Sequence, residues 1–214
     1  MTTLLRRPDP VAFDTDDDLH RLASARRDRV RFVNVPAWRY LALDGTEQPG
    51  SEGYQLAIAA LFGTAYRLHF ALKARGVAAP VGGLEGLYWL TPEQRMSDDA
   101  TGTAPDVEWR WRMLIAVPPE ATEDEVDAAV RAGEPTDVLR RLYLDRWTEG
   151  PSAQILHVGP YEAERPTLRR LADAITAAGL RPRGPHHEIY LNDPRRAGPD
   201  RTKTVLRQGV EAAV

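Results

Sequence analysis

The stretch that decides the fold is Glu108-Trp109-Arg110-Trp111-Arg112-Met113-Leu114-Ile115-Ala116-Val117. Side chains of a strand alternate between its two faces, so Arg110 and Arg112 share one face, and the other face carries Trp109, Trp111, Met113, Ile115 and Val117. An apolar face opposite a charged one predicts a strand whose sheet packs against a core on one side.

Strands and one long helix are predicted before this stretch. Residues 31–45 are apolar and aromatic, contain Pro36 and end in Asp44-Gly45, which indicates a bent strand. Residues 51–75 carry apolar side chains at helical spacing and are followed by Gly76, which predicts a long amphipathic helix. Residues 84–90 predict a further strand.

The same order returns after a connector. The connector holds Thr122 and Glu125 in a capping-box pattern, which predicts a short helix. A strand pair is then predicted at 143–147 and 153–159, followed by a helix that Pro166 opens and Gly179 ends. Two more strands are predicted at 187–191 and 202–208.

The unit strand, long helix, strand, strand therefore occurs twice, which indicates an internal duplication. Neither half has enough amphipathic elements to bury a sheet face well alone. We predict one α+β domain in which two modules are related by a pseudo-twofold axis, with antiparallel sheet, both long helices on one side and a ligand cleft between the halves. The expected parts are an N-terminal docking segment at 1–30, a first repeat at 31–117, a connector at 118–141 and a second repeat at 142–208.

The docking segment is predicted from charge. The acidic cluster Asp14, Asp16, Asp17 and Asp18 precedes Leu19-His20-Arg21-Leu22, and acidic residues favour the start of a helix. The resulting helix is too short for a helix-turn-helix module of about 60 residues. The chain is therefore not expected to be a complete transcription regulator of that kind.

Composition excludes several classes of protein. The chain has 214 residues, and 28 basic against 31 acidic residues give a net charge of -3, so we expect no nucleic-acid partner. The absence of cysteine removes disulfides, thiolate zinc sites and thiol nucleophiles. No apolar run approaches the roughly 20 residues that span a bilayer, and the N-terminus lacks an apolar signal core. We expect no membrane contact and a cytoplasmic protein.

The candidate site centres on Glu188. Alternation places His186, Glu188 and Tyr190 on one strand face, and we expect the other face, with its apolar pair, to point to the helices. Glu188 would then point to the opposite, concave side. Glu85 lies on a strand of the first half, so the two carboxylates could face one cavity. Alternatively, Glu85 and Glu188 pair with arginines such as Arg110 or Arg112 and serve only the fold.

The sequence gives little support for metal binding, phosphate binding or nucleophilic catalysis. His186 and His187 are adjacent, so their rings diverge in a strand and do not chelate one metal together. The sequence has neither a phosphate-binding loop nor a nucleophile elbow. We therefore predict no metal and no cofactor. A carboxylate in a poorly solvated aromatic pocket has a raised pKa or attracts a cation, and aromatic faces favour the same cationic guests.

Four separated stretches resemble the GyrI-like small-molecule-binding proteins: Phe32–Gly45, Leu84–Trp89, Gln154–Tyr161 and His186–Arg196. The resemblance covers about residues 30–208 and implies two related modules that form a cleft. The family includes drug-binding domains of multidrug-responsive transcription regulators, in which a buried glutamate and aromatic residues hold lipophilic cations. It also includes stand-alone proteins, more similar to this chain, that hydrolyse cyclopropanoid genotoxins with a glutamate near tyrosine and tryptophan. By position, Glu188 would be that glutamate.

Three functions are compatible with these residues. The first is binding of aromatic, lipophilic, often cationic small molecules, with a role in protection from drugs or xenobiotics. The second is hydrolysis of a strained cyclopropane, with Glu188 as general base and Tyr143 or Tyr190 as proton donor. The third is modulation of a protein partner, which would need an exposed apolar patch. The candidate catalytic residues are Glu188 and Tyr143, and the candidate ligand-binding residues are Trp109, Trp111, Tyr190, Trp147, Glu85, Trp89, Tyr54 and His186.

Overall fold

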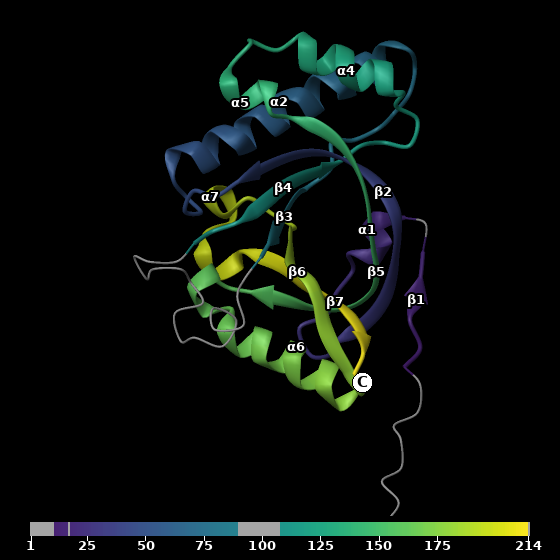
Figure 1. Cartoon of the computed structure of the whole chain (residues 1–214), viewed down its shortest axis with the longest axis vertical. Coiled ribbons are helices and arrows are strands. Elements are labelled where there is room, and N and C mark those ends of the chain that lie inside the picture. The colour runs from purple at the N-terminus through teal and green to yellow at the C-terminus, as the bar shows by residue number, and fades with distance from the viewer. Residues whose placement is uncertain (1–10, 17, 90–107, 214) are drawn as a thin grey trace, which may run out of the picture.

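A seven-stranded sheet that closes on itself forms the centre of the fold (Figure 1). The computed structural model describes residues 11–16, 18–89 and 108–213. The strand order is β1-β2-β4-β3-β6-β7-β5, and β2 also pairs with β5, which closes the barrel. Every pairing is antiparallel except that of β1 with β2. The strands are β1 (Asp14–Thr15), β2 (Arg31–Gly45), β3 (Leu84–Tyr88), β4 (Trp111–Ala116), β5 (Tyr143–Val158), β6 (Leu180–Tyr190) and β7 (Lys203–Ala212).

Helices cover the outside of this sheet. In Figure 1, α2 lies with α4 and α5 at one end of the molecule, and α6 lies at the other end. The helices are α1 (Leu19–Leu22), α2 (Glu52–Ala74), α4 (Glu123–Arg131), α5 (Asp137–Arg140), α6 (Arg165–Ala177) and α7 (Pro194–Ala197), with single 3-10 turns η1 (Tyr161–Ala163) and η2 (Pro199–Arg201). No helix among the described residues is both long enough and apolar enough to cross a membrane.

Local signals in the sequence set the ends of the two long helices. The Ser51 side chain accepts a hydrogen bond from the backbone N–H of Tyr54 at the start of α2, and Gly76 follows its end with a φ of 83°. Pro166 lies in the first turn of α6, and Gly179 follows that helix with a φ of 70°. Helix α2 packs on β2 and β4 in the larger core, and α6 packs on β5 and β7 in a second core.

The predicted fold class is confirmed, with one correction in the strands. The order strand, long helix, strand, strand occurs as β2-α2-β3-β4 and again as β5-α6-β6-β7. The predicted pair of strands at 143–147 and 153–159 is wrong, because β5 runs unbroken from Tyr143 to Val158. Its length lets it pair with β2 along its first part and with β7 along its last part. Residues 1–10, Asp17 and Leu90 of the predicted segments lie outside the described residues.

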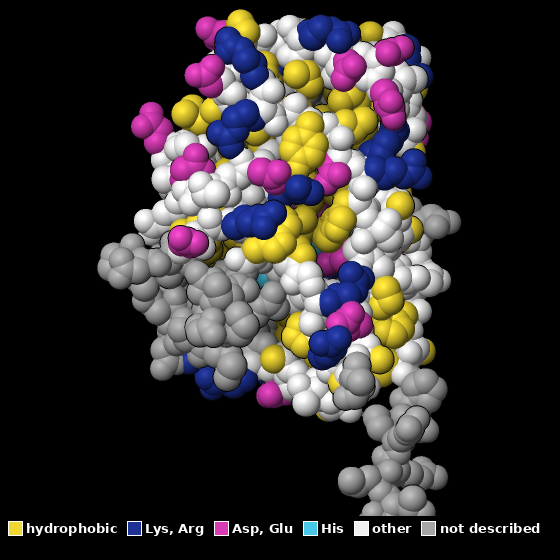
Figure 2. All heavy atoms as spheres, viewed as in Figure 1, with side chains coloured by type: hydrophobic (Ala, Val, Ile, Leu, Met, Phe, Trp, Pro, Cys, Tyr) yellow, Lys and Arg dark blue, Asp and Glu magenta, His cyan; other side chains and the backbone are white. Residues whose placement is uncertain are grey.

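Tight packing fixes strand β4 at its first residue. Trp111 is 1% exposed, and its indole N–H donates to the carbonyl of Glu47 at 2.7 Å. A Cβ atom on Gly45 would lie 2.1 Å from the Trp111 ring, so the ring needs a glycine beside it. Arg110 and Arg112 lie on the other face of the strand, as predicted, with their guanidinium groups over the Trp89 ring. On the molecular face shown in Figure 2, basic and acidic side chains are interspersed.

Candidate functional site

Three tyrosine hydroxyls and Glu188 form a continuous hydrogen-bonded chain where the two halves meet. The Tyr54 hydroxyl lies 2.8 Å from that of Tyr88, which lies 2.6 Å from that of Tyr190. Tyr190 donates to Oε2 of Glu188 at 2.8 Å. Tyr54 comes from the first turn of α2, Tyr88 ends β3, and the other two lie on β6, which pairs with β3.

The direction of this chain follows from the number of protons. A phenol has one O–H to donate, and Tyr190 gives it to Glu188. In the contact between Tyr88 and Tyr190, Tyr88 must therefore donate, and Tyr54 must donate to Tyr88. The chain of three phenols thus ends on one carboxylate oxygen, which accepts from Tyr190 and is held in a fixed position by this hydrogen bond.

Glu188 is poised to exchange a proton near neutral pH. Burial raises its pKa to about 7, against the opposing effects of the Tyr190 hydrogen bond and the charge of His187. Its side chain is 16% exposed, so a ligand can reach it. His186 Nε2 lies 3.7 Å from its other oxygen, Oε1. A partly exposed carboxyl with a pKa near 7 suits general acid–base catalysis.

The start of α6 brings a second carboxyl and a further ring to this place. Glu164 is buried, and its Oε1 is without a hydrogen-bond partner. Burial and repulsion from Glu188 and Glu162 raise the pKa of Glu164 well above its usual range, so it is neutral at pH 7. The Tyr161 ring packs edge-on against Tyr190 with centroids 5.9 Å apart.

Two tryptophans of the first half contact the tyrosines of this site. Trp111 packs edge-on against Tyr54, and Trp109 packs in the same way against Tyr88, at centroid separations of 5.1 and 6.3 Å. Trp111 is buried and packs against the Tyr54 ring in the core, whereas Trp109 is half-buried. The predicted residues Glu188, Tyr190, Tyr54, Trp109, Trp111 and His186 therefore do lie together.

The predicted orientation of Glu188 relative to the helices is wrong. Tyr54 on α2 ends the chain that leads to Glu188, so the Glu188 face of β6 is the one that the helices flank. His187 points instead into the closed barrel. Because the sheet closes on itself, it has an interior. The side chains on the His187 face of β6, which were expected to pack against the helices, point into that interior instead.

The expectation that Glu85 and Glu188 could face one cavity is also wrong. Glu85 pairs in register with Ile189, and its Oε2 lies 3.0 Å from Nε2 of His187 inside the barrel. Glu149 lies 3.0 Å from the other ring nitrogen of His187 and also accepts from Arg207 at 3.1 Å. Two carboxylates thus face two cations in a dry interior.

This interior network is held in its charged state. Despite opposing burial, Glu149 and Glu85 raise the pKa of His187 to about 9, while His187 and Arg207 lower the pKa of Glu149 to about 2. The alternative prediction that Glu85 pairs with an arginine such as Arg110 or Arg112 is wrong in its partner, because Glu85 pairs with His187.

Three further predicted residues lie on the interior side. Tyr143, Trp89 and Trp147 pack in a cluster around Tyr40 and Leu87. The Tyr143 hydroxyl donates to Asp44 at 3.0 Å, so the structure does not bring this predicted proton donor to Glu188, whose hydrogen bond comes from Tyr190. Strand alternation explains the error, because Tyr143 pairs in register with Ala42, whose neighbours Leu41 and Leu43 face the α2 core.

Sequence reasoning missed four residues of importance. Tyr88 alternates with Leu87 and Trp89, and this alternation is the signal that could have placed it on the Glu188 face. Tyr161 and Glu164 lie in a turn whose direction the sequence does not show. Glu149 lies between the two strands predicted at 143–147 and 153–159, in the middle of β5.

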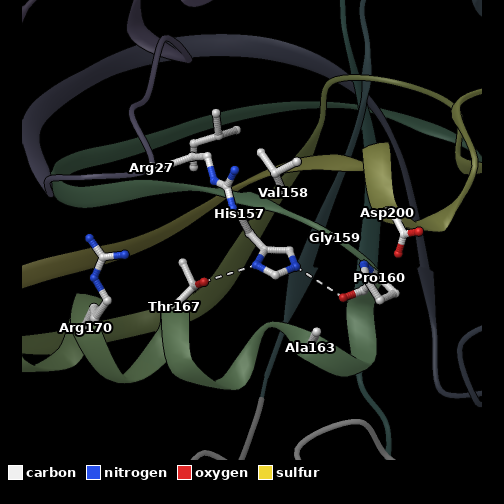
Figure 3. Close-up of a pocket in the computed structure, with 10 residues that line it drawn as sticks. Arg27, His157, Val158, Gly159, Pro160, Ala163, Thr167, Arg170 and Asp200 are labelled. Atoms are coloured by element: carbon white, nitrogen blue, oxygen red, sulfur yellow. Dashed lines mark hydrogen bonds between the residues drawn. The ribbon is translucent and has the colours of Figure 1, made fainter.

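A separate open cavity of about 360 Å³ lies beside His157, between the end of β5 and α6 (Figure 3). The His157 ring lies 3.1 Å from Thr167 Oγ1 and 3.1 Å from the carbonyl of Pro160. The carbonyl only accepts, so Nε2 carries the proton and Nδ1 accepts from Thr167. Glu188 does not line this cavity. Among the described residues, no group of three or more His, Asp or Glu side chains is placed to hold a metal ion.

The fold and this site define a class of small-molecule-binding α+β proteins. Residues 116–208 match the GyrI-like small molecule binding domain. An uncharacterized conserved protein from Listeria innocua is 32% identical, with a TM-score of 0.75 over 87% of this chain and 94% of that one. The chain belongs to the GyrI-like family.

Two other solved structures are similar. A hydrolase from Listeria innocua is 28% identical, with a TM-score of 0.73 over 90% of this chain and 97% of that one. The C-terminal domain of EcmrR is 13% identical, with a TM-score of 0.56 over 86% of this chain and 98% of that one, a likeness that concerns the fold alone. No match was found among the curated proteins.

Proposed function

We propose that this chain hydrolyses a strained, electrophilic small molecule, of the cyclopropane-bearing class, with Glu188 as the general base. The observation that carries the proposal is a partly exposed carboxyl with a pKa near 7 at the end of three aligned phenols. The similar Listeria innocua structure described as a hydrolase supports the reaction class.

The step needs only water and the substrate. Glu188 takes a proton from water as the water oxygen bonds to a cyclopropane carbon. One ring carbon–carbon bond breaks, and its electron pair moves into a conjugated carbonyl, whose oxygen becomes negative. Tyr190 then gives its proton to that oxygen and takes the proton from Glu188, which restores both side chains and leaves an enol that returns to the carbonyl form. Proton transfer of this kind contributes roughly 100- to 10,000-fold in rate.

A second candidate is binding without chemistry. A carboxylate beside aromatic rings also suits a flat lipophilic cation, and bound positive charge would favour the ionised form of Glu188. The observation that favours this candidate is the neutral, buried carboxyl of Glu164, which a bound cation could ionise. In both cases we expect the ligand to lie over the seam of β3 and β6, between α2 and η1.

One variant separates the two candidates. Glu188→Gln keeps the shape of the side chain but removes the base. If turnover is lost while the affinity for a cationic dye is kept, the chain is a hydrolase. If cations bind more weakly while neutral aromatic molecules of equal size bind as before, it is a binding protein. Unchanged turnover and unchanged affinity would refute both roles of Glu188.

Turnover is best followed by mass spectrometry in ¹⁸O-water, because hydrolysis places the water oxygen on the opened ring. Glu162→Gln is the matched control, since Glu162 is exposed on η1 next to the same site. It removes a nearby charge without touching the tyrosine chain. We expect the control to keep turnover within about two-fold of the unmodified protein, as is usual for exposed positions.

A further inference from the structure

Three charged side chains line the cavity beside His157. Arg27 and Arg170 line it from segments far apart in the sequence, and Asp200 lines it from η2 (Figure 3). Among the described residues, neither arginine has an ion-pair partner, whereas Arg26 and Arg31 are each paired with an aspartate. Two free guanidinium groups at one cavity favour an anionic guest.

His157 adds no charge to the cavity. Burial and the nearby charge of Arg27 lower the pKa of His157, so its ring is neutral. Its ring hydrogen bonds are already made to Thr167 and Pro160. The positive charge of the cavity therefore comes from Arg27 and Arg170, and Asp200 supplies the negative charge among the lining residues.

We propose that this cavity binds a small oxyanion, a carboxylate or phosphate, between Arg27 and Arg170. Asp200 would accept a hydrogen bond from a hydroxyl or amine on the same molecule. The proposal does not depend on the proposed hydrolysis.

The cavity shares a wall with the Glu188 site. Pro160, Ala163 and Thr167 line the cavity, while Tyr161 and Glu164 of the same segment reach the other side. A ligand that restrains this segment would therefore also fix the position of Glu164 relative to Glu188. The site is thus placed to act as an effector site.

Inorganic phosphate is the probe, followed by ³¹P NMR at constant ionic strength with chloride as the balancing ion. We expect saturable binding, and we expect Arg27→Gln and Arg170→Gln each to raise Kd by about ten-fold or more, as for hydrogen bonds to charged groups. Arg169→Gln is the matched control, because Arg169 is an exposed neighbour on α6 that does not line the cavity. No saturable binding, or an equal effect of the control, would overturn the proposal.

A second inference rests on the outer face of α2. Leu56, Tyr66 and Phe70 are 50%, 51% and 61% exposed, although all three are large and apolar. They lie on one stripe with alternating spacings of four and three residues, the period at which two helices pack along a seam. The stripe consists of Glu52, Leu56, Ala59, Gly63, Tyr66, Phe70 and Lys73.

This stripe is complementary to a second copy of itself. In an antiparallel pair centred at Gly63, Leu56 faces Phe70, and Tyr66 lies within one residue of the position that faces the small Ala59. The exposed ends are also complementary in charge, because Glu52 of one copy lies within one residue of the position that faces Lys73 of the other, and neither has an ion-pair partner among the described residues. We infer that two copies of this chain form a dimer through α2 about a twofold axis.

Sedimentation equilibrium tests the dimer. We expect Tyr66→Ser with Phe70→Ser to give monomers, and Leu191→Ser, at an exposed apolar residue outside the stripe, to leave the dimer unchanged. Glu52→Lys and Lys73→Glu should each weaken the dimer by roughly two- to five-fold, the scale of exposed ion pairs, and together restore it. A monomer at tens of micromolar, or a dimer that ignores the stripe substitutions, would contradict the inference.

Discussion

Removing the Tyr190 hydroxyl tests how the pKa of Glu188 is set. In Tyr190→Phe, the carboxylate loses a hydrogen bond of 2.8 Å that favours its charged form. A hydrogen bond to a charged group is worth about 1.5–3 kcal/mol, and about 1.4 kcal/mol corresponds to one pKa unit. The pKa of Glu188 should therefore rise by about one to two units from its value near 7.

The consequence for a general base is direct. At pH 7 the ionised fraction of Glu188 should fall from about half to roughly 1–10%, so this effect alone should lower turnover roughly five- to fifty-fold and should be reversed at higher pH. The loss of the Tyr190 proton donor lowers turnover at every pH, so the pH profile should shift upward in pH and also reach a lower maximum. The assay is a ¹³C NMR titration of the Glu188 carboxyl, beside the pH profile of turnover.

Tyr161→Phe is the control for this titration. Tyr161 touches Tyr190 through its ring, and no hydrogen bond joins its hydroxyl to Glu188 within the described part of the chain. The control should shift the midpoint much less. A Glu188 midpoint that stays or falls in Tyr190→Phe, or that moves equally in the control, would refute the reasoning.

Three other substitutions probe the rest of the structure. Glu164→Gln should make stability depend less on pH above pH 4.5. The folded state holds the Glu164 proton more tightly than the unfolded chain does, so the free energy of unfolding of the native protein falls as the pH rises above that value. Urea titrations at pH 5 and pH 9 measure this slope. Glu149→Gln should lower the free energy of unfolding at pH 7 by about 3–5 kcal/mol in urea titrations, because two buried cations lose their shared partner. Gly45→Ala should lower it by about 1–3 kcal/mol in the same assay, because the new methyl group overlaps the Trp111 ring.

Much of the fold follows from local signals in the sequence. Ser51 and Gly76 set the ends of α2, and the alternation around Trp111 set the faces of β4. Barrel closure could not be predicted in the same way, because the pairing of β2 with β5 joins segments more than a hundred residues apart. Without closure, the sequence gives no reason to expect an interior that accepts His187 and its two carboxylates.

The parts of the candidate site that follow from local alternation could be predicted, and the parts that depend on non-local packing could not. Glu188 and Tyr190 share a face by strand alternation alone, which is a local property. The prediction of Glu85 rests on analogy between the halves and that of Tyr143 on the family resemblance, and both side chains lie on the other side of the sheet. Glu164 depends on how the turn after β5 is directed, which only the packing of α6 determines.

The most direct test of the central claim is a crystal structure of the Glu188→Gln variant soaked with a cyclopropane-bearing aromatic substrate. The account predicts an unopened substrate over the seam of β3 and β6, with its strained ring beside position 188 and its carbonyl toward Tyr190. A substrate bound beside the interior cluster around Tyr40 and Leu87, or in the cavity beside His157, with the Glu188 site left empty, would contradict the account.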